Sequence, residues 1–394
     1  MTRSVLVSGA SIAGPALAYW LDRHGFDVTV VEKAPAVRGG GYAIDIRGTA
    51  LGVVERMGLL PELRRAHVDT RRITFLDTEG APIAALETDV VVGSDARHDL
   101  EVRRGDLAAG LYRLTRDPVE YLFDDSIATL DDRGDHVDVT FRGGARRRFD
   151  LVIGADGLHS HTRGLVFGPE QPFHRYLGRA FAGFTLPNDF ALEREAVVWN
   201  VPDRGAALYA YEPGERIHGF LFFGRAEPPF DAFRDPRAQR DLVAATFPDR
   251  RWEIPRLVAA LREADDLFFD IVSQIHLPTW SKGRVALAGD AAHAPSFLSG
   301  QGSSLSLVGA YVLAGELATH ADHTAAFSAY EKTLREFVTL NQALAGTGGT
   351  VVTPRTQQEL DARDRALRDR TALPSEERGR AAYNALVLPD YDRT

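Results

Sequence analysis

Three short apolar segments lie far apart in the chain, and each runs directly into a turn that contains glycine. They are residues 4–8, 149–153 and 284–288, and the turns begin at Gly9, Gly154 and Gly289. Short apolar runs of this kind are typical of strands that are buried on both faces of a parallel sheet. Because ligands bind where the carboxyl ends of such strands meet, we expect the three turns to converge on one site.

The first turn opens a predicted strand–turn–helix–strand unit. Residues 9–14 read GASIAG, apolar residues at helical spacing follow from Ile12 to His24, and a second strand covers residues 28–31. A glycine-rich turn in this setting commonly binds the phosphates of a dinucleotide, because the helix N-terminus supplies free N–H groups and a favourable dipole. The alternative is a glycine-rich turn that binds no ligand.

If the turn binds a dinucleotide, its glycines and its serine each have a specific role. Gly9 permits the tight turn, Gly14 permits close packing of the helix, and Ser11, which replaces the middle glycine, can donate its hydroxyl to a phosphate. Glu32 ends the second strand, where an acid accepts from a ribose and disfavours a 2′-phosphate, so this turn predicts FAD or NAD and not NADP. The predicted contacts are Gly9, Ser11, Ile12, Ala13, Gly14, Glu32 and Lys33.

Composition excludes several classes of protein. The chain has 394 residues, a formal net charge of −9 and no cysteine. A negative surface repels nucleic acid, and the lack of cysteine excludes disulfides, thiolate metal sites and a redox-active cysteine pair. No apolar run reaches the length of a membrane span and the N-terminus enters a strand at once, so we expect a cytoplasmic protein without a membrane partner. We expect a monomer or a weak dimer.

The length predicts two domains, which the order of the segments interleaves. Aromatic, alternating strands broken by Pro and Gly occupy residues 71–97 and 170–274, and they predict a mostly antiparallel sheet that binds substrate. The dinucleotide-binding α/β domain, with a Rossmann-like parallel sheet, takes residues 1–70, 98–169 and 275–320. Residues 321–394 predict a C-terminal helical segment, whose charged tail from residue 355 forms one exposed helix and a loose end.

The second and third turns carry longer motifs. Residues 154–163 read GADGLHSHTR and residues 289–302 read GDAAHAPSFLSGQG. Together with the first turn, they resemble the three ordered motifs of the class A flavoprotein monooxygenases, the p-hydroxybenzoate hydroxylase type, over about residues 1–320. Residues 38–48, RGGGYAIDIRG, and residues 103–107, RRGDL, look most like the branch that contains the tetracycline-inactivating monooxygenases.

The resemblance implies a fold, two cofactors and a reaction. It implies a Rossmann-like FAD-binding domain interleaved with an antiparallel-sheet substrate domain, non-covalent FAD, and NADPH or NADH as a transient reductant. In this family the reduced flavin and O2 form a C4a-hydroperoxide that passes one oxygen to the substrate. We therefore expect an NAD(P)H:oxygen monooxygenase that hydroxylates an aromatic or polycyclic, polyketide-like small molecule. Baeyer–Villiger oxidation, epoxidation and the choice between NADH and NADPH stay open.

The resemblance also implies individual cofactor-binding residues. Asp290 ends a strand and can accept from a ribityl hydroxyl, and N–H groups at the start of the following buried helix can face the flavin pyrimidine, where charge appears on reduction. In the family, the Asp-Gly motif contacts both FAD and the nicotinamide nucleotide, so the resemblance implies binding roles for Asp156 and Arg163. The cofactor-binding residues that these motifs imply are Arg38, Asp45, Arg104, Asp156, Asp290, Gly300, Gln301, Gly302 and Ser303.

Each of these assignments has an ordinary structural alternative. Asp156 and Asp290 can be turn-capping residues, Arg104 can form a surface ion pair, and the RGGG segment that holds Arg38 can be a flexible loop. The pair His159 and His161 has no ligand cluster nearby in the sequence, so we expect no metal site.

The substrate pocket is the least constrained part of the prediction, and no catalytic residue can be named. Alternation in the aromatic strands suggests Tyr209, Phe220 and Phe222, which can equally be core residues. Phe297 stands where the family often has a Pro-Pro pair, and it is expected to narrow the space beside the flavin. Two rival functions remain at this point: a flavin-dependent reductase or dehydrogenase on the same fold, and a non-catalytic flavoprotein that sequesters a ligand.

Overall fold

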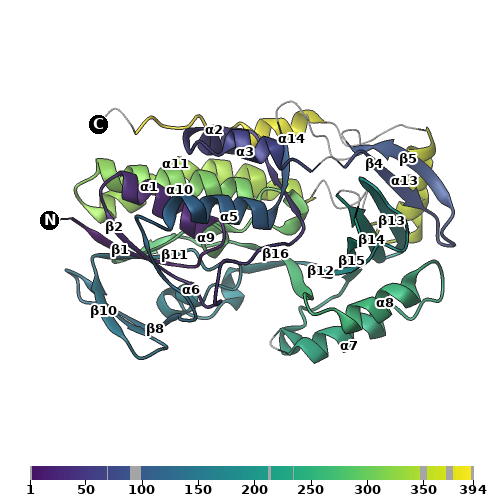
Figure 1. Ribbon diagram of the computed structural model, residues 1–394, viewed down its shortest axis with the longest axis horizontal. Coiled ribbons are helices and arrows are strands. Elements are labelled where there is room, and N and C mark those ends of the chain that lie inside the picture. The colour runs from purple at the N-terminus through teal and green to yellow at the C-terminus, as the bar shows by residue number, and fades with distance from the viewer. Residues whose placement is uncertain are drawn as a thin grey trace.

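A six-stranded sheet organises one half of the molecule (Figure 1). The computed structural model describes residues 2–68, 70–88, 99–211, 214–233, 235–346, 353–369 and 376–391. The strand order is β17-β18-β11-β1-β2-β7, and every neighbouring pair is parallel except β17 with β18. The strands are β1 (Ser4–Ser8), β2 (Asp27–Val31), β7 (Glu120–Leu122), β11 (Leu151–Gly154), β17 (Ser281–Lys282) and β18 (Val285–Leu287).

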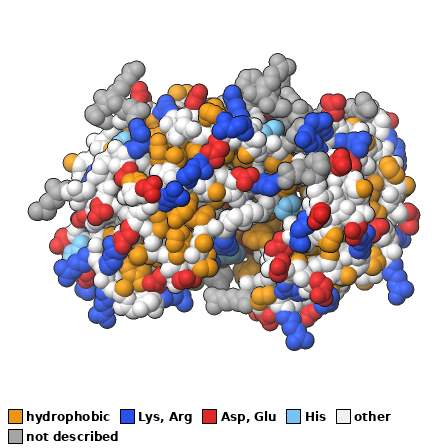
Figure 2. Space-filling view, in the orientation of Figure 1, with side chains coloured by type: hydrophobic (Ala, Val, Ile, Leu, Met, Phe, Trp, Pro, Cys, Tyr) orange, Lys and Arg blue, Asp and Glu red, His pale blue; other side chains and the backbone are white. Residues whose placement is uncertain are grey.

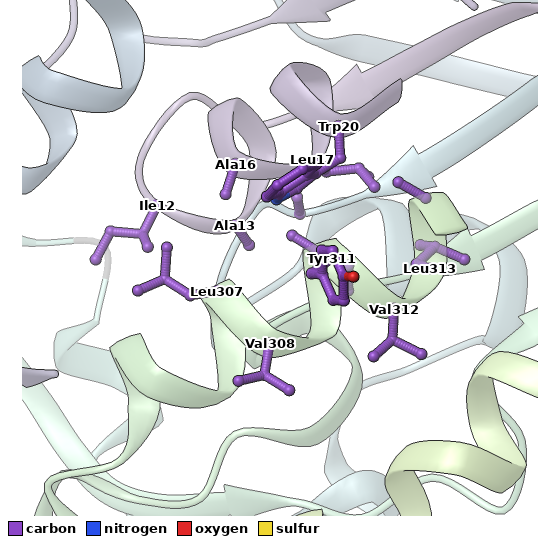
Figure 3. Packing of buried hydrophobic residues seen from close by; sticks show 14 of the residues in the cluster. Ile12, Ala13, Ala16, Leu17, Trp20, Leu307, Val308, Tyr311, Val312 and Leu313 are labelled. Atoms are coloured by element: carbon purple, nitrogen blue, oxygen red, sulfur yellow. The ribbon is translucent and has the colours of Figure 1, made fainter. Parts of the chain in front are cut away.

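Helices cover one face of this sheet. They are α1 (Ala13–Arg23), α2 (Thr49–Arg56), α5 (Arg104–Thr115), α10 (Gly302–Thr319) and α11 (His323–Ala343). The small residues Ala13 and Ala16 let α1 approach α10 closely, and Trp20 packs edge-on against Tyr311 with ring centroids 4.9 Å apart (Figure 3). Helix α10 is buried along almost its whole length, as its uniformly apolar sequence predicts.

A small antiparallel sheet covers the other face. Its strands are β8 (Ile127–Asp132), β9 (Val137–Phe141) and β10 (Arg146–Phe149). Leu6, Val31 and Val152 pack against it, whereas their strand neighbours Val5 and Ile153 face the helices. The alternation of side chains along each strand therefore fills a hydrophobic layer on both sides of the parallel sheet.

A seven-stranded sheet forms the other half, in the order β16-β12-β15-β14-β13-β4-β5. Only β13 and β4 run parallel. The strands are β4 (Arg72–Leu76), β5 (Pro82–Glu87), β12 (His174–Pro187), β13 (Glu195–Val201), β14 (Arg204–Ala210), β15 (Arg216–Gly224) and β16 (Phe268–Ile275).

One face of the seven-stranded sheet is covered by α7 (Pro236–Thr246) and α8 (Ile254–Glu263). Along β15, Ile217, Leu221 and Phe223 are buried in this layer, and Phe220 and Phe222 are half-buried on the opposite face. The alternation of β15 therefore leaves aromatic side chains on the face that α7 and α8 do not cover.

Shorter elements connect the two halves. A two-stranded antiparallel ribbon pairs β3 (Ala43–Ile46) with β6 (Leu100–Arg103). The remaining helices are α3 (Leu60–Arg65), α6 (His161–Phe167), α9 (Asp290–His293), α13 (Gln357–Asp369), α14 (Glu376–Tyr383) and the 3-10 turns η1 (Gln171–Phe173), η2 (Phe230–Ala232), η3 (Phe297–Ser299) and η4 (Leu344–Gly346).

The predicted fold class is confirmed: a parallel sheet is interleaved with a mostly antiparallel one, and helices follow. The domain boundaries stay a prediction, although the strands of the two large sheets follow them to within one residue, at Ile275. The predicted strand 149–153 is divided between β10 and β11 at Asp150. No helix among the described residues combines the length and apolarity needed to cross a membrane.

The expectation of an exposed helix and a loose end after residue 355 is wrong for the described part of the tail. Helix α13 buries Leu360, Arg363 and Leu367, and it packs on β5 and β13. Near the end of the chain, Tyr391 is buried and donates its hydroxyl to Glu316 Oε1 at 2.7 Å. The charged composition of this segment gave no sign of burial, because only a few residues on one side of α13 are buried and the others face solvent.

We expect Gly14→Ala to destabilise the fold, because a Cβ at Gly14 would lie 1.8 Å from the carbonyl oxygen of Gly9. Overpacking of this kind lowers the free energy of unfolding by about 1–3 kcal/mol. Gly164→Ala is the matched control, since no atom lies within 4 Å of the added Cβ. Urea denaturation of the FAD-free protein measures both, and a Gly14→Ala variant as stable as the control would contradict the packing.

Candidate active site

The carboxyl ends of β1, β11 and β18 are joined by backbone hydrogen bonds. Ala155 N–H donates to Ser8 O at 2.8 Å, and Ala288 N–H donates to Gly154 O at 2.9 Å. Gly9 has φ +108°, and a Cβ there would lie 2.5 Å from the Ala155 carbonyl oxygen. The three glycine turns therefore converge at one edge of the sheet, as the sequence pattern predicts.

The first turn leaves the N-terminus of α1 available to a ligand. Ile12 occupies the N-cap position and offers no side chain to cap the helix, and the first turn contains no acid. Ser11 beside it is exposed. Glu32 lies at the same turn, because one carboxylate oxygen accepts from Ala10 N–H at 2.8 Å and the other from Ala34 N–H at 2.9 Å. This arrangement suits an anionic group at the helix and a hydroxyl at Glu32.

Arg104 connects two of the quoted segments to this turn. Its Nη1 donates to Ser11 Oγ at 3.1 Å, and its backbone N–H donates to Tyr42 O at 3.2 Å. Burial lowers the pKa of its guanidinium, Tyr42 opposes that shift, and the exposed Arg38 adds to it. Two cations thus lie close together beside a helix N-terminus, which favours a bound anion. Lys33 is a third exposed cation in the same stretch of chain.

The third motif presents two buried polar atoms that lack a partner. Among the described residues, neither Asp290 Oδ1 nor Gln301 Nε2 has a hydrogen-bond partner. Burial and the nearby Asp270 raise the pKa of the Asp290 carboxyl to about 6, and Arg163 opposes this shift. Buried polar groups in proteins are nearly always satisfied, so one unpaired acceptor and one unpaired donor point to a polar ligand.

The segment from residue 300 to 303 lies beside both Asp290 and Asp45. A Cβ on Gly302 would lie 3.7 Å from Asp290 Oδ1, and one on Gly300, which has φ +66°, would lie 3.0 Å from Asp45 Oδ2. Ser303 follows in the half-buried first turn of α10. The structure therefore brings this segment, Asp290 and Asp45 together from three distant parts of the chain.

Asp45 lies in a charged group with Arg47 and Glu101, two residues that the sequence analysis did not single out. It pairs with buried Arg47 at 3.1 Å and lies opposite Glu101 in the β3–β6 ribbon. Burial and Asp45 raise the pKa of Glu101 to about 8, whereas Arg47 and a hydrogen bond from Tyr209 lower it. The Tyr209 hydroxyl is 3.5 Å from Glu101 Oε1. An acid that titrates near neutral pH can accept or release a proton during turnover.

An aromatic group is built from residues of both halves of the molecule. Figure 2 shows apolar side chains in a hollow between the two halves on the face that it draws. Tyr42 is the centre of the aromatic group, with ring centroids at 6.0 Å from Phe220, 5.9 Å from Phe297 and 6.1 Å from Phe268. Phe181 stacks on Phe297 at 4.7 Å. Phe297 and Phe268 are 48% and 41% exposed, which is unusual for such large apolar side chains and marks a surface that a ligand can cover.

Backbone geometry fixes the position of Phe297. Ser296 before it has φ +88°, a conformation that a non-glycine residue rarely adopts and that costs about 1–3 kcal/mol. Its side chain accepts from Leu298 N–H and so holds the turn η3. Strain of this size is concentrated at functional sites, and here it presents Phe297 to the ring of Phe181.

The four residues predicted to line the substrate pocket have different surroundings in the structure. Phe220 and Phe297 share Tyr42 as a neighbour, and Tyr209 lies at Glu101 and 5.1 Å from Tyr211. Phe222 instead packs over Gly205, and no ring contact joins it to the aromatic group in the part of the chain that the structure describes. Sequence reasoning missed Tyr42, Phe181, Phe268 and Tyr211. Tyr211 carried a signal, because it lies two residues from Tyr209 and thus on the same face.

The second motif has a structural role in addition to any binding role. The Asp156 carboxylate accepts from Thr162 N–H at 2.9 Å and from the Ser160 hydroxyl, so it caps α6. The Arg163 side chain is fully buried and donates to Ala291 O at 2.9 Å and to Glu170 at 2.7 Å. The expected contact of Arg163 with a nucleotide is not supported, because its guanidinium joins the second motif to the third. A cofactor role for Asp156 stays a prediction.

His159 of the same motif lies between two carboxylates. Burial lowers the pKa of its imidazole, but hydrogen bonds to Asp270 and Glu170 outweigh burial and raise the pKa to about 9.

Comparison with known proteins identifies the family. The sequence profile of the FAD binding domain matches residues 2–341. The uncharacterized protein MT1298 of Mycobacterium tuberculosis (strain CDC 1551 / Oshkosh) is 44% identical over 91% of this chain and 97% of its own length. A flavin-dependent monooxygenase of an unknown prokaryotic organism is 38% identical over 87% of this chain and 88% of its own length.

A solved structure agrees with these relatives. The tetracycline destructase Tet(55) superposes with a TM-score of 0.85 and 34% identity, covering 99% of each chain. The predicted resemblance, the FAD cofactor and the monooxygenase activity are thereby confirmed, and monooxygenases of this class use NAD(P)H as reductant. The chain belongs to the FAD-binding class A flavin monooxygenases.

Proposed function

We propose that this monooxygenase inserts one oxygen atom of O2 into an aromatic or polycyclic, polyketide-like small molecule. The observation that carries the proposal is the group of Tyr42, Phe181, Phe220, Phe268 and Phe297, two of whose rings are exposed at the junction of the two halves. Large flat rings favour a flat apolar substrate, because stacking and edge contacts add to the burial of area. Tetracyclines, the substrates named for Tet(55), are one member of this class.

The residues at the carboxyl edge fit FAD. The Gly9–Gly14 turn and the open N-terminus of α1 suit the diphosphate, and Arg104 adds a positive charge beside Ser11. Asp290 offers the unpaired oxygen that a ribityl hydroxyl needs. The proposed cofactor set is Gly9, Ser11, Ile12, Ala13, Gly14, Glu32, Lys33, Arg38, Asp45, Arg104, Asp156, Asp290, Gly300, Gln301, Gly302 and Ser303.

Bound FAD, once reduced by NADPH or NADH, supplies the chemistry that activates O2. The protein's part is to position the substrate and exclude water. Gly300 lies beside Asp45, and Phe297 of the same segment contacts Tyr42, so the proposed flavin position and the aromatic group share one loop. Arg38, exposed and close to Arg104, is the residue we assign to the anionic reductant. Tyr209, Phe220 and Phe297 are the proposed substrate contacts, and Phe222 is a less favourable one.

Glu101 and Tyr209 are the groups that we propose to move a proton. Electron-rich phenols react faster with an electrophilic oxygen when their hydroxyl is deprotonated. Tyr209 OH lies 3.5 Å from Glu101 Oε1, so a substrate proton given to the hydroxyl can pass on to the carboxylate.

A panel of anthracyclines, tetracyclines and simple phenols tests the proposed substrate class. We expect at least one polycyclic phenol to accelerate NADPH or NADH oxidation and to gain the mass of one oxygen atom, with matching O2 consumption. A panel in which only non-aromatic substrates gain oxygen would refute the proposed class while leaving the family membership intact. Mass spectrometry of the products distinguishes these outcomes.

Asp290→Asn should separate FAD binding from stability. The carboxyl pKa of about 6 in the FAD-free protein lies above its unfolded value of 3.8, so this group favours folding below pH 4 and loses that contribution as the pH rises through 6. We therefore expect FAD-free Asp290→Asn to melt above FAD-free wild type at pH 8, with a smaller difference at pH 5.

Added FAD should nevertheless raise the melting temperature of Asp290→Asn less than that of wild type, with FAD affinity reduced by about tenfold or more. Asp117→Asn, at a side chain 85% exposed, is the matched control and should behave as wild type in both measurements. Equal FAD-induced shifts in wild type and Asp290→Asn would show that Asp290 does not contact the cofactor.

Glu101→Gln should change the pH profile of the reaction. With a pKa of about 8, Glu101 accepts protons only as the pH rises through that value, so we expect kcat/KM of the wild type to increase across pH 7–9 for a phenolic substrate. The variant should lack this increase, and Glu101→Asp should retain part of it. A Glu101→Gln profile that still rises across the same interval would assign the proton transfer to another group.

A further inference from the structure

A group of two histidines and two acids lies outside the proposed flavin site, where the segment after β11, the start of β12 and the start of β16 meet. His159 Nδ1 is 2.8 Å from Glu170 Oε1, and His174 Nε2 is 3.2 Å from the same oxygen. The potential ligand atoms of these three residues all lie within 4.8 Å of one another. Sequence reasoning considered only His159 and His161, because Glu170 and His174 follow in a separate segment.

His174 is the observation that points to a missing partner. Its side chain is only 3% exposed, yet neither ring nitrogen makes a hydrogen bond of acceptable geometry among the described residues. The short approach to Glu170 therefore brings the two groups together without satisfying the imidazole. A buried imidazole nitrogen without a partner calls for an explanation, and a bound metal ion supplies one, because imidazole nitrogen and carboxylate oxygen are both ligands of Zn²⁺.

The other residues are oriented from behind, as in known metal centres. Asp270 Oδ1 accepts from His159 Nε2 at 3.0 Å, which directs Nδ1 toward the centre of the group. Glu170 Oε2 accepts from Arg163 Nη2 at 2.7 Å, so that Oε1 is the carboxylate oxygen on the side of the two histidines. Outer carboxylates that hold the second nitrogen of a histidine ligand fix its tautomer and raise its basicity.

We propose that His159 Nδ1, His174 Nε2 and Glu170 Oε1 bind one divalent transition-metal ion of the Zn²⁺ type. Two imidazoles and one carboxylate are a ligand set that Zn²⁺ accepts in proteins, with a fourth position left for water. The 39% exposed side chain of His159 places that position toward solvent. Arg163 extends from Glu170 to the carbonyl of Ala291, so the bound ion would brace the short helix α9, which begins at Asp290.

Calorimetric titration of ZnCl2 into the FAD-loaded enzyme at pH 8 tests the proposal, because proton competition for the histidines is weaker there than at pH 6. We expect one Zn²⁺ per chain, with binding weakened at least tenfold by His174→Ala or His159→Ala and tenfold to a hundredfold by Asp270→Asn. His161→Ala is the matched control: this histidine is exposed, lies two residues from His159 and takes no part in the group, so binding should be unchanged.

Two results would overturn the metal site. One is an equal loss of Zn²⁺ binding in His161→Ala and His174→Ala, and the other is wild-type binding no tighter than that of the His159/His174 double variant. In either case the residues are an ion-pair network only. Retained flavin absorbance and melting temperature establish that each variant folds. If a variant does not fold, anomalous scattering at the zinc edge from wild-type crystals decides, since a zinc peak elsewhere, or none, also rejects the site.

Discussion

The active site depends on the backbone hydrogen bonds that join the ends of β1, β11 and β18. Ala155 N–H to Ser8 O and Ala288 N–H to Gly154 O hold three turns from distant parts of the chain within one edge of the sheet. The backbone segments at this edge lie close together, so Gly9, beside the Ala155 carbonyl, and Gly14, beside the Gly9 carbonyl, have no room for a side chain. The position of Asp290, and of the segment that begins α10, follows from this junction.

The two halves of the molecule also meet next to this edge. The loop between α9 and α10 contributes Gly300 beside Asp45 and Phe297 against Phe181 of the seven-stranded sheet. Tyr211 OH accepts from Ala43 N–H at 2.8 Å, which ties that sheet to the ribbon on which Asp45 lies. The elements proposed to bind the cofactor and those proposed to bind the substrate are therefore connected by direct contacts. A substitution of Phe297 is therefore expected to change which substrate shapes the enzyme accepts more than its affinity for FAD, since the ring neighbours of Phe297 are the aromatic side chains of Tyr42 and Phe181.

The sequence was most informative where local pattern and tertiary role coincide. Apolar runs ending in glycine predicted the convergence of the three turns, and alternation predicted that Tyr209 and Phe220 share the face of their sheet that α7 and α8 do not cover. The sequence was less informative where a residue's surroundings depend on distant neighbours. Arg163 stands in a binding motif but is buried between two motifs, and Phe222 shares the face of Phe220 yet packs over Gly205. Glu101 and His174 carried no signal, because only the fold brings Tyr209 or Glu170 beside them.

The central proposal is that the three turns and Asp290 surround one FAD molecule, whose isoalloxazine lies next to the aromatic group. A crystal structure of the FAD-loaded enzyme tests it most directly. The account predicts the diphosphate at residues 9–14, a ribityl hydroxyl within hydrogen-bond distance of Asp290 Oδ1, and the isoalloxazine between residues 300–303 and the rings of Tyr42 and Phe297. An isoalloxazine bound away from the Asp45–Gly300 junction, or an Asp290 oxygen that remains without a partner, would contradict it.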